Sequence, residues 1–158
     1  MSIKMTRAER EAFLADVRVG VLAVADPDRG PLTLPIWYGY EPGGELWFAT
    51  DAGSRKGRLL REGERVSLCV QTETPPYKYV SVEGPVTAIT RNDLERDVRP
   101  LAHRYLGKKI GDLYIAETEG GDARGDGILV RMRPERWSTA DFGKEFSAPA
   151  AGNVAPSK

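Results

Sequence analysis

The stretch ELWFATDAGSRKGRLLREGERVSLCVQT, residues 45–72, contains the pattern of a strand, a turn, a short helix and a second strand. The apolar run 45–50 ends in small and polar residues, and Ser54 is of a type that commonly caps a helix N-terminus. Gly63 is a natural helix stop, and 65–72 alternates apolar and polar residues as a half-buried strand does. This stretch therefore predicts two strands joined by a short helix.

Two adjacent cations, Arg55 and Lys56, occupy the first positions of that helix. Cations at this end are unfavourable in an isolated helix by about 0.3–1 kcal/mol each, whereas an anion is favoured. Arg55 can bind two oxygens at once, Lys56 supplies a point charge, and Thr50 and Ser54 add hydroxyls. We predict a bound phosphate here. The alternative, a solvated basic helix start near no ligand, has about equal support from local chemistry alone.

The rest of the chain is rich in strand patterns. Further strands are predicted over 19–26, 32–40, 79–89 and 128–142, with a break or bulge at Gly84-Pro85 and an interruption at Pro134. The turn Pro42-Gly43-Gly44 predicts a hairpin between 32–40 and 45–50. Helices are predicted over 6–17, from a Thr6–Glu9 capping box, and from 92 or 93 to Tyr105, with one or two further turns around Tyr114. Pro100 is expected to kink the second helix or to divide it into two short helices. The alternation favours a small barrel with peripheral helices.

The strand over 32–40 has two different faces. Leu32, Leu34, Ile36, Tyr38 and Tyr40 share one face. Pro35 cannot donate a ladder hydrogen bond, so the strand is predicted to be an edge strand or bulged. The free backbone groups of such an edge, near Trp37 and Tyr38, could bond the rim of a flat heterocycle. A phosphate grip beside this edge is what a flavin-like cofactor requires.

Composition excludes several other classes of function. The chain has 158 residues, with 23 Lys and Arg against 23 Asp and Glu, and this balance supports neither nucleic-acid nor membrane-surface binding. One cysteine, Cys69, fits a reducing cytoplasm and is interpreted as structural, and His103 is interpreted as a surface residue. No metal site, P-loop, dinucleotide fingerprint, secretory signal or membrane span is evident. We expect one domain over 1–146, and an Ala/Pro/Ser-rich, disordered tail over 147–158.

Three ordered blocks carry a resemblance to a known family: GVLAV (20–24), GPLTLPIWYGY (30–40) and GELWFATDAGSRKGRLLREGERVSLCVQTETPPYKYVSVEGPV (44–86). Together they resemble the pyridoxamine 5′-phosphate oxidase-like split-barrel superfamily, and within it the flavin or deazaflavin oxidoreductases of actinobacterial type. The resemblance implies a mainly β (α+β) fold, a six-stranded antiparallel split β-barrel with peripheral helices. It also implies a homodimer with two cofactor sites at the subunit interface.

The resemblance also implies which residues bind the cofactor. The phosphate-binding group falls on Ser54, Arg55 and Lys56, and the strand along the ring system falls on Leu34, Pro35, Ile36, Trp37 and Tyr38. The end of the next strand falls on Thr50 and Asp51. The block Pro75, Pro76, Tyr77, Lys78 and Tyr79 is expected to reach a site from the other subunit, and Trp137 loosely matches a residue that closes the site.

The implied function is transfer of hydride to a small organic substrate by reduced coenzyme F420, with FMN as the close alternative. The residues that bind substrate phosphate and pyridoxal in true pyridoxamine phosphate oxidases are not evident, which disfavours vitamin B6 oxidation. No catalytic acid or base is assigned: Tyr38 or Tyr79 could donate a proton, but packing is the preferred role for both. The rival functions are a non-catalytic flavin, deazaflavin or haem-type binder, and a dimeric scaffold without a cofactor.

Overall fold

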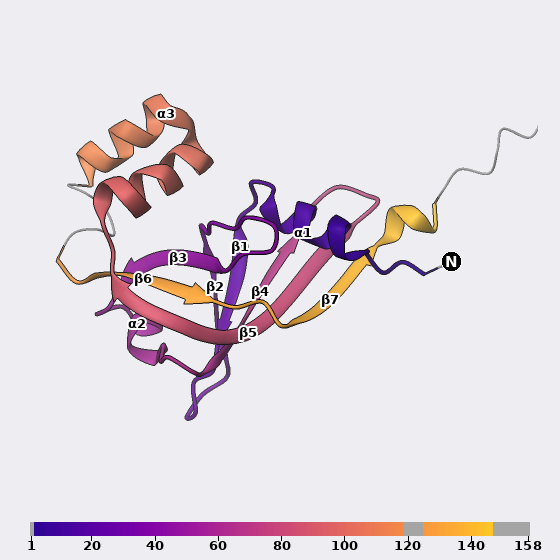
Figure 1. Cartoon of the computed structure of the whole chain (residues 1–158), viewed down its shortest axis with the longest axis horizontal. Helices are drawn as coiled ribbons and strands as arrows, with labels where there is room; N and C mark the ends of the chain where they lie inside the picture. The colour runs from indigo at the N-terminus through magenta and orange to yellow at the C-terminus, as the bar shows by residue number, and fades with distance from the viewer. Residues whose placement is uncertain (1, 119–124, 147–158) are drawn as a thin grey trace, which may run out of the picture.

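The computed structural model describes residues 2–118 and 125–146 (Figure 1). The expected tail, 147–158, and most of the expected loop over 118–127 lie outside these ranges. Within them the chain forms a curled antiparallel sheet with helices at its margins, which confirms the predicted fold class. No helix of the described ranges is both long and apolar enough to cross a membrane.

The sheet has seven strands. They are β1 (Gly20–Val24), β2 (Leu32–Ile36), β3 (Leu46–Asp51), β4 (Arg65–Gln71), β5 (Lys78–Arg91), β6 (Gly127–Met132) and β7 (Arg136–Asp141). Six lie in the order β2-β1-β4-β5-β6-β3, and β7 pairs with β5 outside this path. The predicted strand over 128–142 is divided at Pro134 into β6 and β7, which gives the barrel its extra strand.

Among the described residues, a single bridge joins the segments at the two ends of this path, so the barrel is not closed by a continuous ladder there. Gly39 and Trp47 form an isolated bridge, in which the Gly39 N–H donates to the Trp47 carbonyl at 2.8 Å and the Trp47 N–H donates back at 3.0 Å. The Trp47 indole packs so closely on Gly39 that a Cβ at Gly39 would overlap it. Among the described residues, this bridge is the extent of the predicted hairpin between 32–40 and 45–50. β2 pairs along its length with β1, and β3 with β6, and these longer ladders satisfy more backbone groups.

β2 lies at the edge of the sheet, as Pro35 indicated. Ile36, Tyr38 and Tyr40 are buried, whereas Thr33 and Pro35 are exposed. The predicted alternation is thus confirmed, and it continues past the last β2 residue. This edge position leaves one side of the β2 backbone without a strand partner among the described residues.

β5 is the strand around which the sheet bends. Its first half pairs with β4 and β7, and its second half pairs with β6 after a register shift between Val86 and Ala88. The strand is continuous through Gly84-Pro85, so the predicted irregularity lies two residues later. Gly84 has another role: a Cβ there would overlap the carbonyl oxygen of Arg133 and lie 3.2 Å from the Met132 sulfur. A glycine is needed because β5 and the end of β6 approach closely there.

Helix α1 (Arg7–Ala15) closes one end of the barrel. The predicted capping box is confirmed: the Thr6 hydroxyl accepts from the Glu9 N–H at 3.2 Å, and the Glu9 carboxylate accepts from the Thr6 N–H at 2.8 Å. Phe13 and Leu14 enter the barrel core. A 3₁₀ turn, η3 (Phe142–Lys144), follows β7, and Lys144 Nζ pairs with Glu9 at 2.7 Å.

The segment between β5 and β6 is a helical hairpin (Figure 1). A π-helical turn, η1 (Leu94–Val98), leads into α3 (Arg99–Glu117), and the Asp93 carboxylate caps η1 at the Arg96 N–H. The chain reverses at Gly107, whose φ of 77° is left-handed. Pro100 lies in the first turn of α3, where proline is tolerated, and does not kink that helix. The predicted alternative of two short helices is closer, since η1 ends at Val98 and α3 begins at Arg99.

The two arms of the hairpin are joined by an ion cluster. Asp112 accepts from Arg99 Nη1 at 2.7 Å and lies 2.6 Å from His103 Nε2. Hydrogen bonds from His103 and then Arg99 lower the pKa of the Asp112 carboxyl. His103 is 29% exposed, so it lies at the surface as predicted, but its side chain also links the first arm to the second.

Candidate functional site

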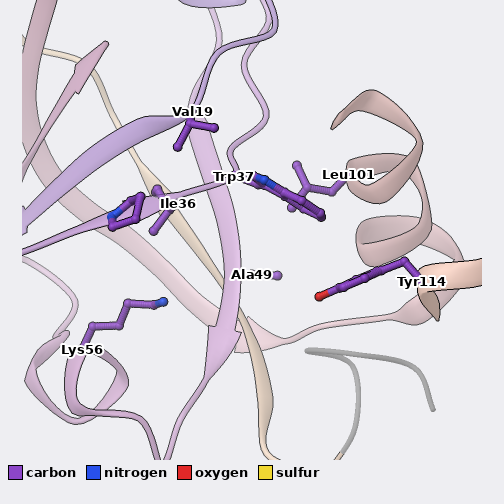
Figure 2. A pocket seen from close by; sticks show the side chains of 8 residues that line it. Val19, Ile36, Trp37, Ala49, Lys56, Leu101 and Tyr114 are labelled. Atoms are coloured by element: carbon purple, nitrogen blue, oxygen red, sulfur yellow. The ribbon is translucent and has the colours of Figure 1, made fainter. Parts of the chain in front are cut away.

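A cavity of about 340 Å³ lies between the edge of the barrel and the helical hairpin (Figure 2). We call it the Trp37 pocket. It is lined by Val19, Pro35, Ile36, Trp37, Ala49, Lys56, Leu101 and Tyr114. Four of these were predicted as site residues from the sequence, and the other four were not.

Trp37 stands at the wall between the barrel and the hairpin. Its ring stacks on Tyr105 with centroids 5.1 Å apart and an interplanar angle of 5°, and Tyr114 tilts against it at 5.5 Å. The Tyr105 hydroxyl donates to the Arg18 carbonyl at 2.6 Å and accepts from the Tyr38 N–H at 3.1 Å. These contacts fix the hairpin to the chain that follows β2. They therefore hold the aromatic wall in place.

Lys56 enters the Trp37 pocket from the other side. Figure 2 shows its ammonium group and the Tyr114 hydroxyl directed from opposite sides toward the space beside Ala49. Lys56 lies on α2 (Arg55–Leu59), which Ser54 caps by accepting from the Gly57 N–H at 3.1 Å. The predicted cap is confirmed. The helix has only five residues, so its dipole adds little and the side chains must carry any anion binding.

Arg55 has a partner that sequence reasoning missed. Its Nη2 lies 2.9 Å from Oδ2 of Asp26, in the turn between β1 and β2. The hydrogen bond from Arg55 lowers the pKa of the Asp26 carboxyl. Of the two cations at the start of α2, Arg55 is therefore paired with a carboxylate of the same chain, and Lys56 lines the pocket.

The predicted hydroxyl and carboxylate groups lie beside these cations. The Thr50 and Ser54 hydroxyl oxygens are 3.4 Å apart, and the Ser54 hydroxyl donates to the Asp51 carbonyl at 2.7 Å. The Asp51 carboxylate accepts from the Gly53 N–H at 2.8 Å. Thr50 is buried, and Asp51 is exposed. A Cβ at Gly57 would overlap the Asp51 carbonyl oxygen, so the turn from β3 into α2 requires glycine there.

Tyr38 is part of the core and not of the pocket. Its side chain is fully buried, and its hydroxyl donates to the Leu14 carbonyl at 2.7 Å. Burial raises the pKa of Tyr38 well above its usual range, and burial also raises the pKa of Tyr105. Both phenols stay protonated at neutral pH. The Tyr38 hydroxyl donates its hydrogen to the Leu14 carbonyl, which favours the predicted packing role of Tyr38 over a role as proton donor.

The remaining predicted residues lie away from the Trp37 pocket. Leu34 packs against the barrel core, and the segment Pro76–Tyr79 forms the turn into β5 and its first residues. Within that segment, Tyr77 is 52% exposed and Lys78 Nζ lies 3.7 Å from Asp141. Trp137 lines a different cavity with Arg10. Within one described chain, none of these residues lines the Trp37 pocket.

A groove of about 770 Å³ adjoins the pocket on the outer face of the barrel. It shares Val19 and Pro35 with the Trp37 pocket. The other residues that line it are Val17, Arg18, Val21, Cys69, Gln71, Thr72, Glu73 and Thr74. Val17, Val19 and Val21 are 54%, 53% and 44% exposed, so the groove leaves apolar side chains open to solvent. Burial raises the pKa of the Cys69 thiol, which is consistent with its structural interpretation.

Leu101, Tyr114, Val19 and Ala49 are the pocket residues that sequence reasoning missed. Leu101 and Tyr114 read as apolar positions of a helix, and nothing local indicates that α3 folds back beside β2. Gly107 is the one sequence signal that could have indicated this reversal. Among the residues that the structure describes, no group of three or more His, Cys, Asp or Glu side chains is arranged to hold a metal ion.

The family model described as pyridoxamine 5′-phosphate oxidase matches residues 6–141. The chain belongs to the pyridoxamine 5′-phosphate oxidase family. The match spans the barrel, α2 and the hairpin, and so includes every element that builds the Trp37 pocket. It confirms the resemblance that the blocks over 20–86 indicated. A comparison with curated protein sequences gives no match.

Several solved structures share the fold. A conserved hypothetical protein, Rv2991, from Mycobacterium tuberculosis is 27% identical, with a TM-score of 0.73 over 97% of this chain and 96% of its own. A protein named F420 reductase is 22% identical, with a TM-score of 0.57 over 81% of this chain and 94% of its own. An FAD-binding protein from Mesorhizobium loti is 20% identical, with a TM-score of 0.57 over 85% and 94%. The last two likenesses establish the split barrel alone.

Proposed function

We propose that this protein is an oxidoreductase that binds a flavin-type cofactor in the Trp37 pocket, with reduced coenzyme F420 favoured and FMN as the close alternative. It would transfer hydride to a small organic substrate. The observation that carries the proposal is the joint lining of one cavity by a cation, Lys56, and by the edge strand residues Pro35, Ile36 and Trp37.

The residues present fit such a cofactor. Lys56 supplies a point charge and a donor for a phosphate, and the Thr50 hydroxyl lies nearby, 3.4 Å from that of Ser54. Trp37 and Ile36 supply a flat apolar wall for a ring system, and the open β2 edge supplies backbone groups for its polar rim. Arg55 is already paired with Asp26, so it would bind the phosphate with the guanidinium N–H groups that Asp26 does not use.

When bound, the cofactor supplies the hydride chemistry. This chain would hold the ring against the β2 edge and exclude water with Trp37, Leu101 and Tyr114. We assign no catalytic acid or base. Tyr38 is excluded from the pocket by its place in the core, and the hydroxyl that points into the space is that of Tyr114 (Figure 2).

F420 is favoured over FMN on two grounds. One structural neighbour of the same fold is named F420 reductase. The lactyl-oligoglutamate tail of F420 is negatively charged, and Arg58, Arg61 and Lys78 are cations that could meet it. In this structure Arg58 and Arg61 donate to backbone carbonyls at 2.7 Å, and Lys78 pairs with Asp141, so the preference is slight.

A paired titration of the purified protein with F420 and with FMN, followed by cofactor fluorescence, tests the proposal. Tight binding of F420 alone supports the deazaflavin enzyme and directs a substrate screen with the reduced cofactor. Tight binding of FMN alone moves the assignment to a flavin enzyme. Binding of neither contradicts it. The rival function, a non-catalytic flavin or haem-type binder, predicts bound cofactor without electron transfer to any acceptor.

We also propose a cytoplasmic location, which suits a chain with one cysteine.

We further propose a homodimer in which the outer groove forms part of the interface. The exposed side chains of Val17, Val19 and Val21 border the Trp37 pocket, and a second subunit would remove them from water. The Pro76–Tyr79 segment of that subunit would then supply the second wall of the site. Light scattering at micromolar concentration is expected to give twice the mass of 17.4 kDa. A monomer would contradict the interface site.

A further inference from the structure

A second cavity, of about 360 Å³, shares no lining residue with the Trp37 pocket. We call it the Arg10 pocket. Its walls come from the first turns of α1, the turn between Tyr40 and Glu45, and the connection from β6 to Trp137. The volume is at the lower end of the roughly 300–1,000 Å³ typical of small-molecule sites. Nothing in the proposed oxidoreductase function uses this cavity.

Arg10 is the side chain that gives this cavity its chemistry. Its guanidinium carbon lies 4.5 Å from the centroid of the Trp137 ring. Its Nε is buried and has no hydrogen-bond partner. The indole stabilises the cation but accepts no hydrogen bond from the guanidinium edge, so a buried donor is left unmet. Among the described residues, none accepts a hydrogen bond from its Nη1 or Nη2 either, so a carboxylate in the cavity could pair with this edge of the guanidinium.

The other charged groups of the cavity already have partners. Arg7 pairs with Glu11 at 3.1 Å, and Glu135 pairs with Arg133 at 3.1 Å and with Arg65 at 2.7 Å. The Glu45 carboxylate accepts from the Thr87 hydroxyl. Among the described carboxylates, none forms an ion pair with Arg10. The Arg10 guanidinium, which stacks on Trp137, is thus a charged group of the cavity without an ion-pair partner among the described residues.

We propose that the Arg10 pocket binds a small monoanionic carboxylate with a flat apolar body. The carboxylate would pair with the guanidinium edge of Arg10, in the two-pronged geometry that suits this pair. The body would lie against Trp137, Pro134 and Tyr40, which line the cavity around Arg10. Three arginines and three glutamates line the cavity, so its balanced charge disfavours a phosphate dianion.

Nuclear magnetic resonance of the full-length, ¹⁵N-labelled protein tests this site directly. The indole N–H signal of Trp137, identified by its loss in Trp137→Phe, is followed as sodium benzoate is added. Benzamide supplies the same ring without the charge, acetate supplies the carboxylate without the ring, and inorganic phosphate supplies a different anion. A saturable shift is expected with benzoate, at about tenfold lower concentration than with any of the other three.

Two arginine substitutions sharpen the test. Arg10→Gln removes the charge and is expected to weaken benzoate binding by about tenfold or more. Arg18→Gln is the matched control, because Arg18 also stacks on an aromatic ring, that of Phe13 at 4.1 Å, but does not line the Arg10 pocket. Its benzoate titration is expected to match that of the unmodified protein.

Three results would overturn the proposal: no saturable shift of Trp137, equal binding of benzoate and benzamide, or unchanged binding in Arg10→Gln. If Arg10→Gln does not fold, the comparison of benzoate with benzamide on the unmodified protein decides alone. The outcome is independent of F420 or FMN binding, because the two cavities share no residue.

Discussion

Replacing Arg55 and Lys56 together by alanine is expected to abolish tight cofactor binding while the barrel stays folded. A hydrogen bond to a charged group contributes about 1.5–3 kcal/mol, so two such bonds to a phosphate correspond to a loss of roughly a hundredfold or more in affinity. Lys56 lines the Trp37 pocket directly, whereas Arg55 is held by Asp26. We therefore expect Lys56→Ala alone to produce the larger share of the loss. The measurement is the dissociation constant for F420 and for FMN by fluorescence titration.

Arg7→Ala is the control for this pair. Arg7 lies on α1, is 77% exposed and pairs with Glu11 at 3.1 Å. Its loss removes a cation without touching the Trp37 pocket. Circular dichroism establishes that the variants remain folded. Unchanged cofactor affinity in a folded double variant would show that Arg55 and Lys56 do not bind the cofactor phosphate.

Replacing Gly84 by alanine is expected to be the most damaging single-methyl change in the barrel. The added Cβ would overlap the Arg133 carbonyl oxygen, which belongs to the backbone and cannot rotate away. Overpacking against a fixed neighbour costs about 1–3 kcal/mol, and a backbone clash belongs at the upper end. For a chain of this length such a loss lowers the melting temperature by roughly 6–12 °C. Thermal denaturation followed by circular dichroism measures it.

Gly30→Ala makes the same chemical change where space is open. No atom lies within 4 Å of the Cβ that it would add, and Gly30 is exposed in the turn before β2. Its melting temperature is expected to stay close to that of the unmodified protein, since surface substitutions of this kind stay within about 0.5 kcal/mol. Equal melting temperatures for the two alanine variants would show that β5 and the end of β6 do not approach as closely as the structure has them.

Sequence reasoning succeeded where the deciding interaction is local. The alternation over 32–40 is confirmed in Ile36, Tyr38 and Tyr40, because successive side chains of a strand point to opposite faces wherever the strand pairs. The caps at Thr6 and Ser54 are confirmed because each hydroxyl binds an N–H three residues along the same chain. The family blocks were equally readable, since they are properties of the sequence itself.

The same reasoning failed where partners are distant in the chain. It joined 32–40 and 45–50 as a hairpin, because they are consecutive, whereas among the described residues one bridge joins them and β3 pairs along its length with β6. It expected a kink or a division at Pro100, where η1 gives way to α3, and it missed the reversal of the chain at Gly107. In both cases the local signal, the Pro42-Gly43-Gly44 turn or Pro100, correctly indicated that the chain could turn or break there. The choice among possibilities depended on which distant surface was available to pack against.

The features of the candidate site also fall into those set by local sequence and those set by contacts between distant residues. The sequence by itself determined that a cation pair follows Ser54, that β2 is an edge strand, and that the chain belongs to a split-barrel family, because each depends on residue type and near neighbours. Only the tertiary structure decided that Asp26 holds Arg55 and that Tyr114 faces Lys56 across one cavity. These contacts join residues 29 and 58 positions apart, and no local pattern encodes which distant side chains a folded sheet will bring together.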